Sequence, residues 1–150
     1  MSGTVVALAV AVAAVNAVPA LLGGWGWYRA EPSRAFWVCL RVGQGSAVLL
    51  AVVVGALAVA GKQATEQLFY LYALLPLAIA FIAEQLRLTA AQAILDGHGL
   101  ENGRAVGQLP VSEQAAIVGA ILRREMGIMA LSALVVVFLV LRAASTAHGF

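Results

Sequence analysis

Glu84 is the residue of this sequence whose type and position are hardest to explain by packing alone. It interrupts a run of side chains that carries no charge from Leu68 to Ala83. A carboxylate is rare at membrane depth, because burying a charge without a partner costs several kcal/mol. A bound proton, a cation or an arginine side chain would each remove that cost. We therefore expect any site in this chain to include Glu84.

Other polar side chains fall at a similar depth when each apolar segment is built as a helix. At ~1.5 Å per residue, Gln44, Glu84 and Arg123 lie roughly 24–27 Å from the outer ends of their segments, with Asn16 nearer the centre. We expect these groups to form one inward-facing polar layer near the cytoplasmic boundary, in which Glu84 pairs with Arg123 or Arg41. The candidate residues of the layer are Asn16, Arg41, Gln44, Glu84, Arg87 and Arg123.

Two interpretations of this layer remain open. In the first, Glu84 carries a proton or cation, or holds an arginine that binds an anionic ligand from the cytoplasm. In the second, the charges pair and determine which helix packs where. Glu84 and Arg87 are one helical turn apart and can pair with each other, while Arg41 and Arg87 can also reach lipid phosphates. Depth near an interface weakens the case for a functional charge and favours the second interpretation.

The sequence contains no recognisable catalytic or metal-binding motif. HExxH, GxSxG and P-loop patterns are absent, and GHGLENGRAVG follows a predicted helix, not a strand. His98 and His148 lie outside the apolar segments, and Cys39 is the single cysteine. We therefore expect no metal, no cofactor and no enzymatic activity.

Composition points to a membrane protein. Of the 150 residues, 63% are hydrophobic and 11% are charged, against about 25% charged in soluble domains. Four apolar segments are each long enough to cross a hydrocarbon core of ~30 Å. We predict an all-α integral membrane protein: one domain, residues 1–150, folded as an antiparallel four-helix transmembrane bundle in sequential order.

The expected spans cover residues 4–22, 36–60, 68–88 and 124–142. Leu68 to Leu95 would measure about 42 Å as a helix kinked at Pro76, so the third and fourth helices should extend into the cytoplasm as a hairpin over about 88–124. Ser112 is the expected N-cap of the fourth helix. We expect an interfacial turn at residues 23–33 and a frayed tail at residues 143–150.

The second span carries small residues at every fourth position, which predicts close helix packing. They are Gly43, Ala47, Ala51 and Gly55. On the third span, Ala73 and Glu84 share the face predicted to pack, whereas Leu75 and Ile79 lie on the face predicted to meet lipid. Such stripes also fit a homo-oligomer or a larger membrane complex.

Basic residues predict the orientation, because cytoplasmic loops are rich in Lys and Arg. The first and third connections with their flanking helix ends hold seven arginines, and the other side holds Lys62 and Arg142. This places loops 1 and 3 in the cytoplasm and both termini outside. An excess of Arg over Lys with abundant Ala and Val suggests a bacterial origin, so the expected location is the bacterial plasma membrane. The net charge of +2 is too small to suggest binding to nucleic acid.

These features favour a non-enzymatic accessory or scaffolding subunit whose partners are the lipid bilayer and other membrane chains. The alternative is a small proton- or cation-coupled transporter that uses Glu84. The chain resembles small multidrug transporters in architecture alone, through its length, four spans and intramembrane glutamate. A lipid-modifying enzyme is a third hypothesis, favoured only by the location of the polar layer.

Overall fold

The computed structural model describes residues 2–150, which are all-helical with no strand in that range. The helices are α1 (Ser2–Arg29), α2 (Arg34–Val59), α3 (Gln67–Gly97), α4 (Gly103–Val106) and α5 (Val111–Thr146). All except α4 are long and apolar enough to cross a membrane. The prediction of an all-helical chain with four such segments is confirmed.

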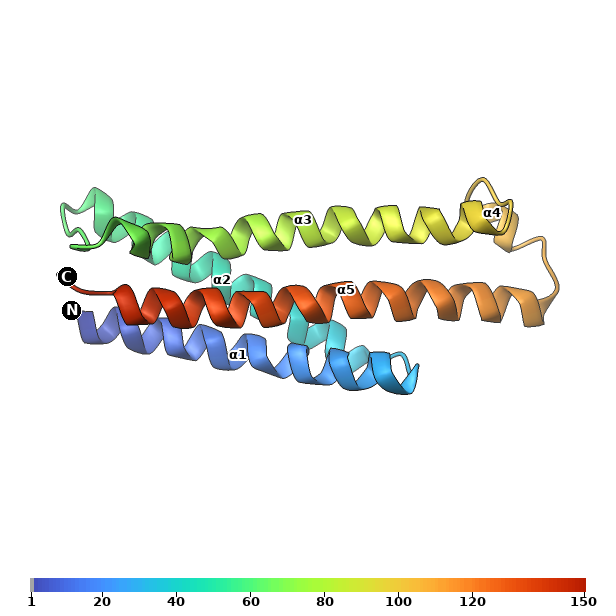
Figure 1. Cartoon of the computed structure of the whole chain (residues 1–150), viewed down its shortest axis with the longest axis horizontal. Helices are drawn as coiled ribbons and strands as arrows, with labels where there is room; N and C mark the ends of the chain where they lie inside the picture. Colours follow the sequence, from blue (N-terminus) through green and yellow to red (C-terminus); the bar gives the residue numbers. More distant parts are fainter. Residues whose placement is uncertain (1) are drawn as a thin grey trace.

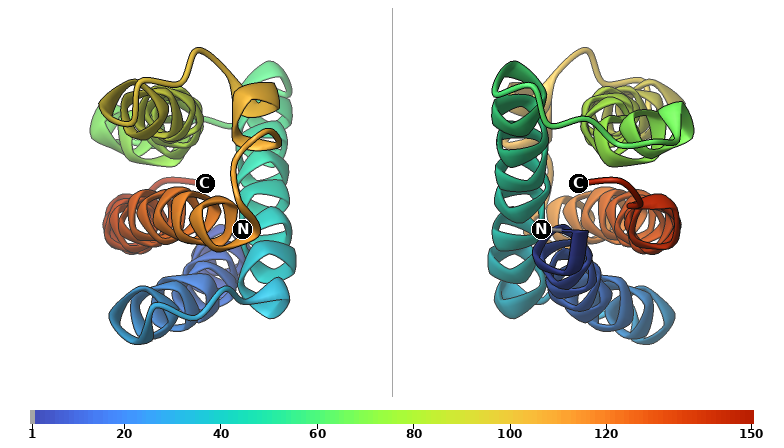
Figure 2. Two further views of the ribbon diagram at one scale, coloured as in Figure 1. Left: turned by 90° about the vertical axis from the view of Figure 1, so that its right-hand side faces the viewer. Right: turned by 90° about the vertical axis from the view of Figure 1, so that its left-hand side faces the viewer.

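The long helices form a layer with one helix crossing it. In Figure 1, α1, α5 and α3 lie side by side, with α5 in the middle. The end-on views of Figure 2 show α2 inclined across one face of this layer, from the end of α1 to the start of α3. Each long helix contacts the next one along the chain, and α5 packs against α1 as well as α3. Both termini lie near the α2–α3 connection, and α3 and α5 extend beyond the turn between α1 and α2 (Figure 1).

The segment expected to be a turn after residue 22 is helical, because α1 continues to Arg29. Its glycines allow neighbours to approach: a Cβ on Gly23 would lie 2.7 Å from the Cβ of Ala130, and one on Gly26 would lie 2.7 Å from the sulfur of Met126. The helix ends where Ala30 takes a left-handed conformation, with φ 56°. The Glu31 N–H then donates to the Gly26 carbonyl at 3.0 Å, which satisfies one of the last carbonyls of the helix.

The start and the end of the last helix also differ from expectation. Ser112 lies inside α5, and Pro110 is the N-cap, whose carbonyl accepts from the Glu113 N–H at 3.0 Å. Proline has no backbone N–H. It is tolerated at this position because an N–H at the start of a helix has no partner within the helix. The tail is not frayed: the His148 carbonyl accepts from the Thr65 N–H at 2.8 Å, and Phe150 packs on Phe69 with ring centroids 5.1 Å apart. The aromatic ring of Phe150 explains why the tail packs against α3. The polar residues before it led to the prediction of a frayed tail.

The small-residue stripe of α2 packs only in its first half. Gly43 and Ala47 are buried, but a Cβ on Gly55 would meet nothing within 4 Å. At that end the core uses Leu50 and Val54 instead, with a relative exposure of 1% each. Because α2 crosses the layer obliquely, one stripe cannot stay in contact along its whole length. The predicted lipid face of α3 is also partly wrong, since Ile79 packs against the core.

Candidate functional site: a polar cluster between α2 and α3

The inclination of α2 brings one of its polar turns against one polar turn of α3. Arg41 and Gln44 are three residues apart on α2, and Glu84 and Arg87 are three residues apart on α3. Residues at this spacing lie on one face of a helix. Each helix therefore presents a pair of long polar side chains to the other, and the four side chains meet.

The Glu84 carboxylate is the centre of this cluster. Arg41 Nη1 lies 2.5 Å from Glu84 Oε1 and 2.7 Å from Gln44 Oε1. The Gln44 amide donates to the same Glu84 oxygen at 3.4 Å, and Arg87 Nη2 lies 3.3 Å from Glu84 Oε2. Both carboxylate oxygens thus have cationic partners, in a charge-assisted arrangement stronger than neutral hydrogen bonds.

Arg87 links this cluster to two further residues. Its guanidinium carbon lies 5.4 Å from the centroid of the Trp37 ring, within the range of a cation–π contact. Glu125 on α5 is close enough for its charge to interact with those of Arg87 and Glu84. Arg87 Nε is buried and has no hydrogen-bond partner within residues 2–150. The cluster therefore joins α2 and α3, its two cations, Arg41 and Arg87, share the one carboxylate of Glu84, and Glu125 of α5 is a second negative charge nearby.

The cluster lies at the edge of the helix packing, not in its centre. The side chain of Glu84 is 27% exposed and that of Arg87 is 24% exposed, whereas Arg41 reaches outward with 52% exposed. Such a position lets Arg41 reach a polar medium while it pairs with Glu84. Chemically, the arrangement can neutralise a carboxylate and hold two helices in register.

Asn16, which was expected in the same layer, forms a separate contact between α1 and α2. Its amide nitrogen donates to the carbonyls of Val12 at 2.9 Å and Gly43 at 3.2 Å, and to the Ser46 hydroxyl at 3.3 Å. Asn16 is 2% exposed, so these bonds satisfy a polar group inside apolar packing. No hydrogen bond joins it to Glu84 among the described residues.

Arg123 does not join the cluster either. Its Nε donates to the Trp27 carbonyl at 3.1 Å, and its guanidinium lies 5.6 Å from the centroid of the Trp27 ring. Helix geometry separates Arg123 from Glu125. The two residues are about 200° apart around α5, so their side chains point to nearly opposite sides. Arg123 faces α1, where it contacts Trp27, and Glu125 points away from that contact.

The sequence interpretation missed Trp37 and Trp27 as partners of the arginines, and Glu125 as a second negative charge near Arg87. A signal for Glu125 was present, since it is a second carboxylate beside the last apolar segment. The two tryptophans had no signal beyond their amphipathic character. Their positions depend on how α1 and α2 cross their neighbours.

Comparison of the chain with protein-family models, with characterised proteins and with solved structures found no match. The functional argument therefore rests on the geometry of the polar cluster and of the surfaces around it.

Proposed function

We propose that the chain is a multi-pass protein of the bacterial plasma membrane with a non-enzymatic role, as an accessory or scaffolding subunit. In this proposal the polar cluster is structural: it holds α2 against α3. The observation that carries the proposal is the engagement of both Glu84 oxygens by Arg41, Gln44 and Arg87. A carboxylate held by two cations has little freedom to exchange a proton or a cation.

The membrane placement belongs to the same proposal. The four long helices cross the bilayer as an antiparallel bundle, with both termini outside and the α1–α2 turn inside. The parts of α3 and α5 that extend past this turn, together with α4, form a helical hairpin in the cytoplasm. Support comes from the distribution of arginines and from the apolar surface of α2, where Val38, Val52 and Val59 are 64%, 61% and 91% exposed. Such a surface suits lipid tails or the helix of another membrane protein.

The substitution Glu84→Gln tests the structural role. It keeps the shape of the side chain but leaves Arg41 and Arg87 without a counter-charge. Breaking a fully buried pair costs ~3–5 kcal/mol, and the partial exposure of this cluster reduces the expected loss of unfolding free energy to about 1–3 kcal/mol. Thermal unfolding of the purified protein in detergent should show a lower melting temperature than the parent.

Glu101→Gln is the matched control, because Glu101 is an exposed carboxylate in the loop before α4. It should leave the melting temperature unchanged. If Glu84→Gln also unfolds like the parent, and if the parent but not this variant moves protons or cations across reconstituted vesicles, the transporter hypothesis replaces the scaffold.

A further inference from the structure

Two hollows of different character meet at Trp27 and Arg124. The first is an apolar groove of about 490 Å³ between α1 and α5. The second, of about 660 Å³, lies between the extended end of α3 and the first half of α5. Trp27 and Arg124 line both. A ligand that is apolar at one end and charged at the other could therefore occupy both at once.

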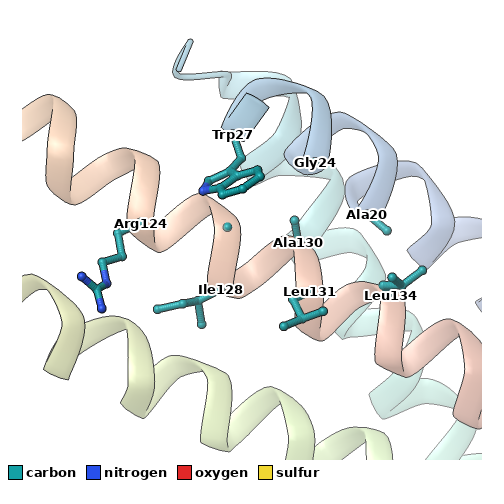
Figure 3. Close-up of a pocket in the computed structure, with 9 residues that line it drawn as sticks. Ala20, Gly24, Trp27, Arg124, Ile128, Ala130, Leu131 and Leu134 are labelled. Carbon is teal, nitrogen blue, oxygen red and sulfur yellow. The ribbon is translucent and has the colours of Figure 1, made fainter. Parts of the chain in front are cut away.

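The apolar groove has a simple construction, which Figure 3 shows. Ala20, Gly24 and Trp27 of α1 form one wall, and Ile128, Leu131 and Leu134 of α5 form the other. Gly127 has no side chain, and a Cβ there would lie 2.8 Å from Trp27 Cδ1. The Trp27 ring can therefore lie against α5, at the border that the two hollows share. Apart from Arg124, every residue that lines the groove is apolar or glycine.

The second hollow is basic. Arg123, Arg124 and His98 contribute to its lining. Arg123 is held in place by its bond to the Trp27 carbonyl, which uses Nε and leaves its terminal nitrogens to donate elsewhere. Arg124 is exposed, and within residues 2–150 no carboxylate lies at ion-pair distance from it. No acidic side chain is among the residues that line either hollow.

We propose that this composite surface binds an anionic phospholipid, with an acyl chain in the groove and the phosphate against Arg124 and Arg123. The charge fits, because guanidinium groups bind phosphate oxygens through paired N–H donors. The length fits too. From Arg124 to Leu134 the groove follows α5 for about 15 Å, which is half of a ~30 Å hydrocarbon core and so one leaflet. The proposal rests on the membrane placement above, which puts this end of α1 and α5 at the cytoplasmic headgroups.

Binding can be measured on the full chain, purified in a nonionic detergent, by native mass spectrometry. The probes are dioleoylphosphatidylglycerol, the phosphatidylcholine with the same acyl chains, and inorganic phosphate. Phosphatidylglycerol should bind the parent at least about tenfold more tightly than phosphatidylcholine, because the choline cation offsets the phosphate charge and is repelled by the arginines; a tenfold difference is the size of one charge-assisted contact. Inorganic phosphate alone should not displace it, because the acyl chain contributes part of the affinity.

Two variants separate the ends of the site. Arg124→Gln should weaken phosphatidylglycerol binding about tenfold and phosphatidylcholine binding less, because the choline cation already offsets the phosphate charge of that lipid. Gly24→Leu should weaken both lipids, because it fills the groove; a Cβ on Gly24 meets nothing within 4 Å, so the fold can accept it. If Gly24→Leu has a lower melting temperature than the parent, Ala20→Leu, one turn away on the same wall, replaces it as the variant that fills the groove.

The controls make the same two kinds of substitution at positions outside the proposed site. Arg34→Gln deletes an exposed arginine near the α1–α2 turn, and Gly45→Leu fills open space beside α2. Both should bind phosphatidylglycerol like the parent. Equal affinity for the two lipids, parent-like binding by Arg124→Gln and Gly24→Leu, or full displacement by phosphate would overturn the proposal. So would a dimer that Gly24→Leu abolishes while lipid binding persists, because a second copy would then occupy the groove.

Discussion

Asn16 shows how this chain accommodates a polar side chain inside apolar packing. Its amide reaches the Gly43 carbonyl on α2 because Gly43 has no side chain: a Cβ there would lie 2.7 Å from Asn16 Oδ1. In surroundings without water, an amide must find its partners within the protein. The pair is therefore a polar contact and a close approach of two backbones at the same place.

Asn16→Leu should lower the unfolding free energy by about 1 kcal/mol or more, because it removes an interhelical hydrogen bond and adds apolar volume against Gly43. Titration with a denaturing detergent, followed by circular dichroism, measures the change. Ser132→Ala is the control, since the Ser132 hydroxyl donates to the Met129 carbonyl of its own helix at 2.7 Å. Equal stability of the two variants would contradict a role for Asn16 between helices.

Adjacent glycines on α1 separate packing from helix propensity. A Cβ on Gly23 would press on the Phe36 ring and on Ala130, whereas one on Gly24 meets nothing within 4 Å. Both residues lie inside α1, so replacing either with alanine changes the backbone preference equally, by up to ~1 kcal/mol in favour of the helix. Any difference between the two variants must come from their neighbours.

Gly23→Ala should destabilise the protein by about 1–3 kcal/mol, the usual cost of overpacking, and Gly24→Ala should match or exceed the parent. Melting temperatures in the same detergent make the comparison. A Gly23→Ala protein as stable as Gly24→Ala would mean that α1 does not pack against Phe36 and Ala130 in this way.

The sequence predicted the existence of each long helix, because the length of an apolar segment is enough for that. It predicted less well which residues pack, because that depends on the angles at which the helices cross. The four long helices follow from uninterrupted apolar segments. Helical continuation through Gly23 and Gly26 does not, because these glycines pack only once Phe36 and Met126 are in place. Gly55 fits the same stripe as Gly43, yet the angle of α2 leaves it without a neighbour.

The candidate site was predictable in part for the same reason. Helical spacing grouped Arg41 with Gln44 and Glu84 with Arg87, and these pairs meet in the structure. Spacing within one helix cannot say how that helix is rotated against another. It therefore could not decide between Arg41 and Arg123 as the partner of Glu84, and the rotation of α5 turns Arg123 toward Trp27.

At the scale of the whole molecule, the two ends differ in how far their helices project and in how many arginines they carry. One end gathers the termini and the α2–α3 connection, and the other carries the projecting parts of α3 and α5 (Figure 1). The arginines concentrate toward the second end. The positive-inside tendency therefore predicts that the projecting hairpin is cytoplasmic.

Single cysteines introduced after Cys39→Ser test this orientation. Ser145→Cys, near the end of α5, should react with an impermeant thiol reagent in intact cells, and Glu101→Cys, in the loop before α4, should react only after lysis. Both positions are exposed in the structure, so burial does not limit either reaction. The opposite pattern would reverse the proposed topology and leave the fold unaffected.

The coupling free energy between Glu84 and Arg41 decides whether the polar cluster holds the helices together. It requires the unfolding free energies of the parent, Glu84→Gln, Arg41→Gln and the double variant. We expect each single change to destabilise and the double change to cost less than their sum, with a coupling of about 1 kcal/mol for this partly exposed pair. The same cycle with Arg123→Gln should be additive within ~0.5 kcal/mol, because Arg123 contacts Trp27 and not Glu84. Additive effects for Glu84 and Arg41 would contradict the structural role of the cluster.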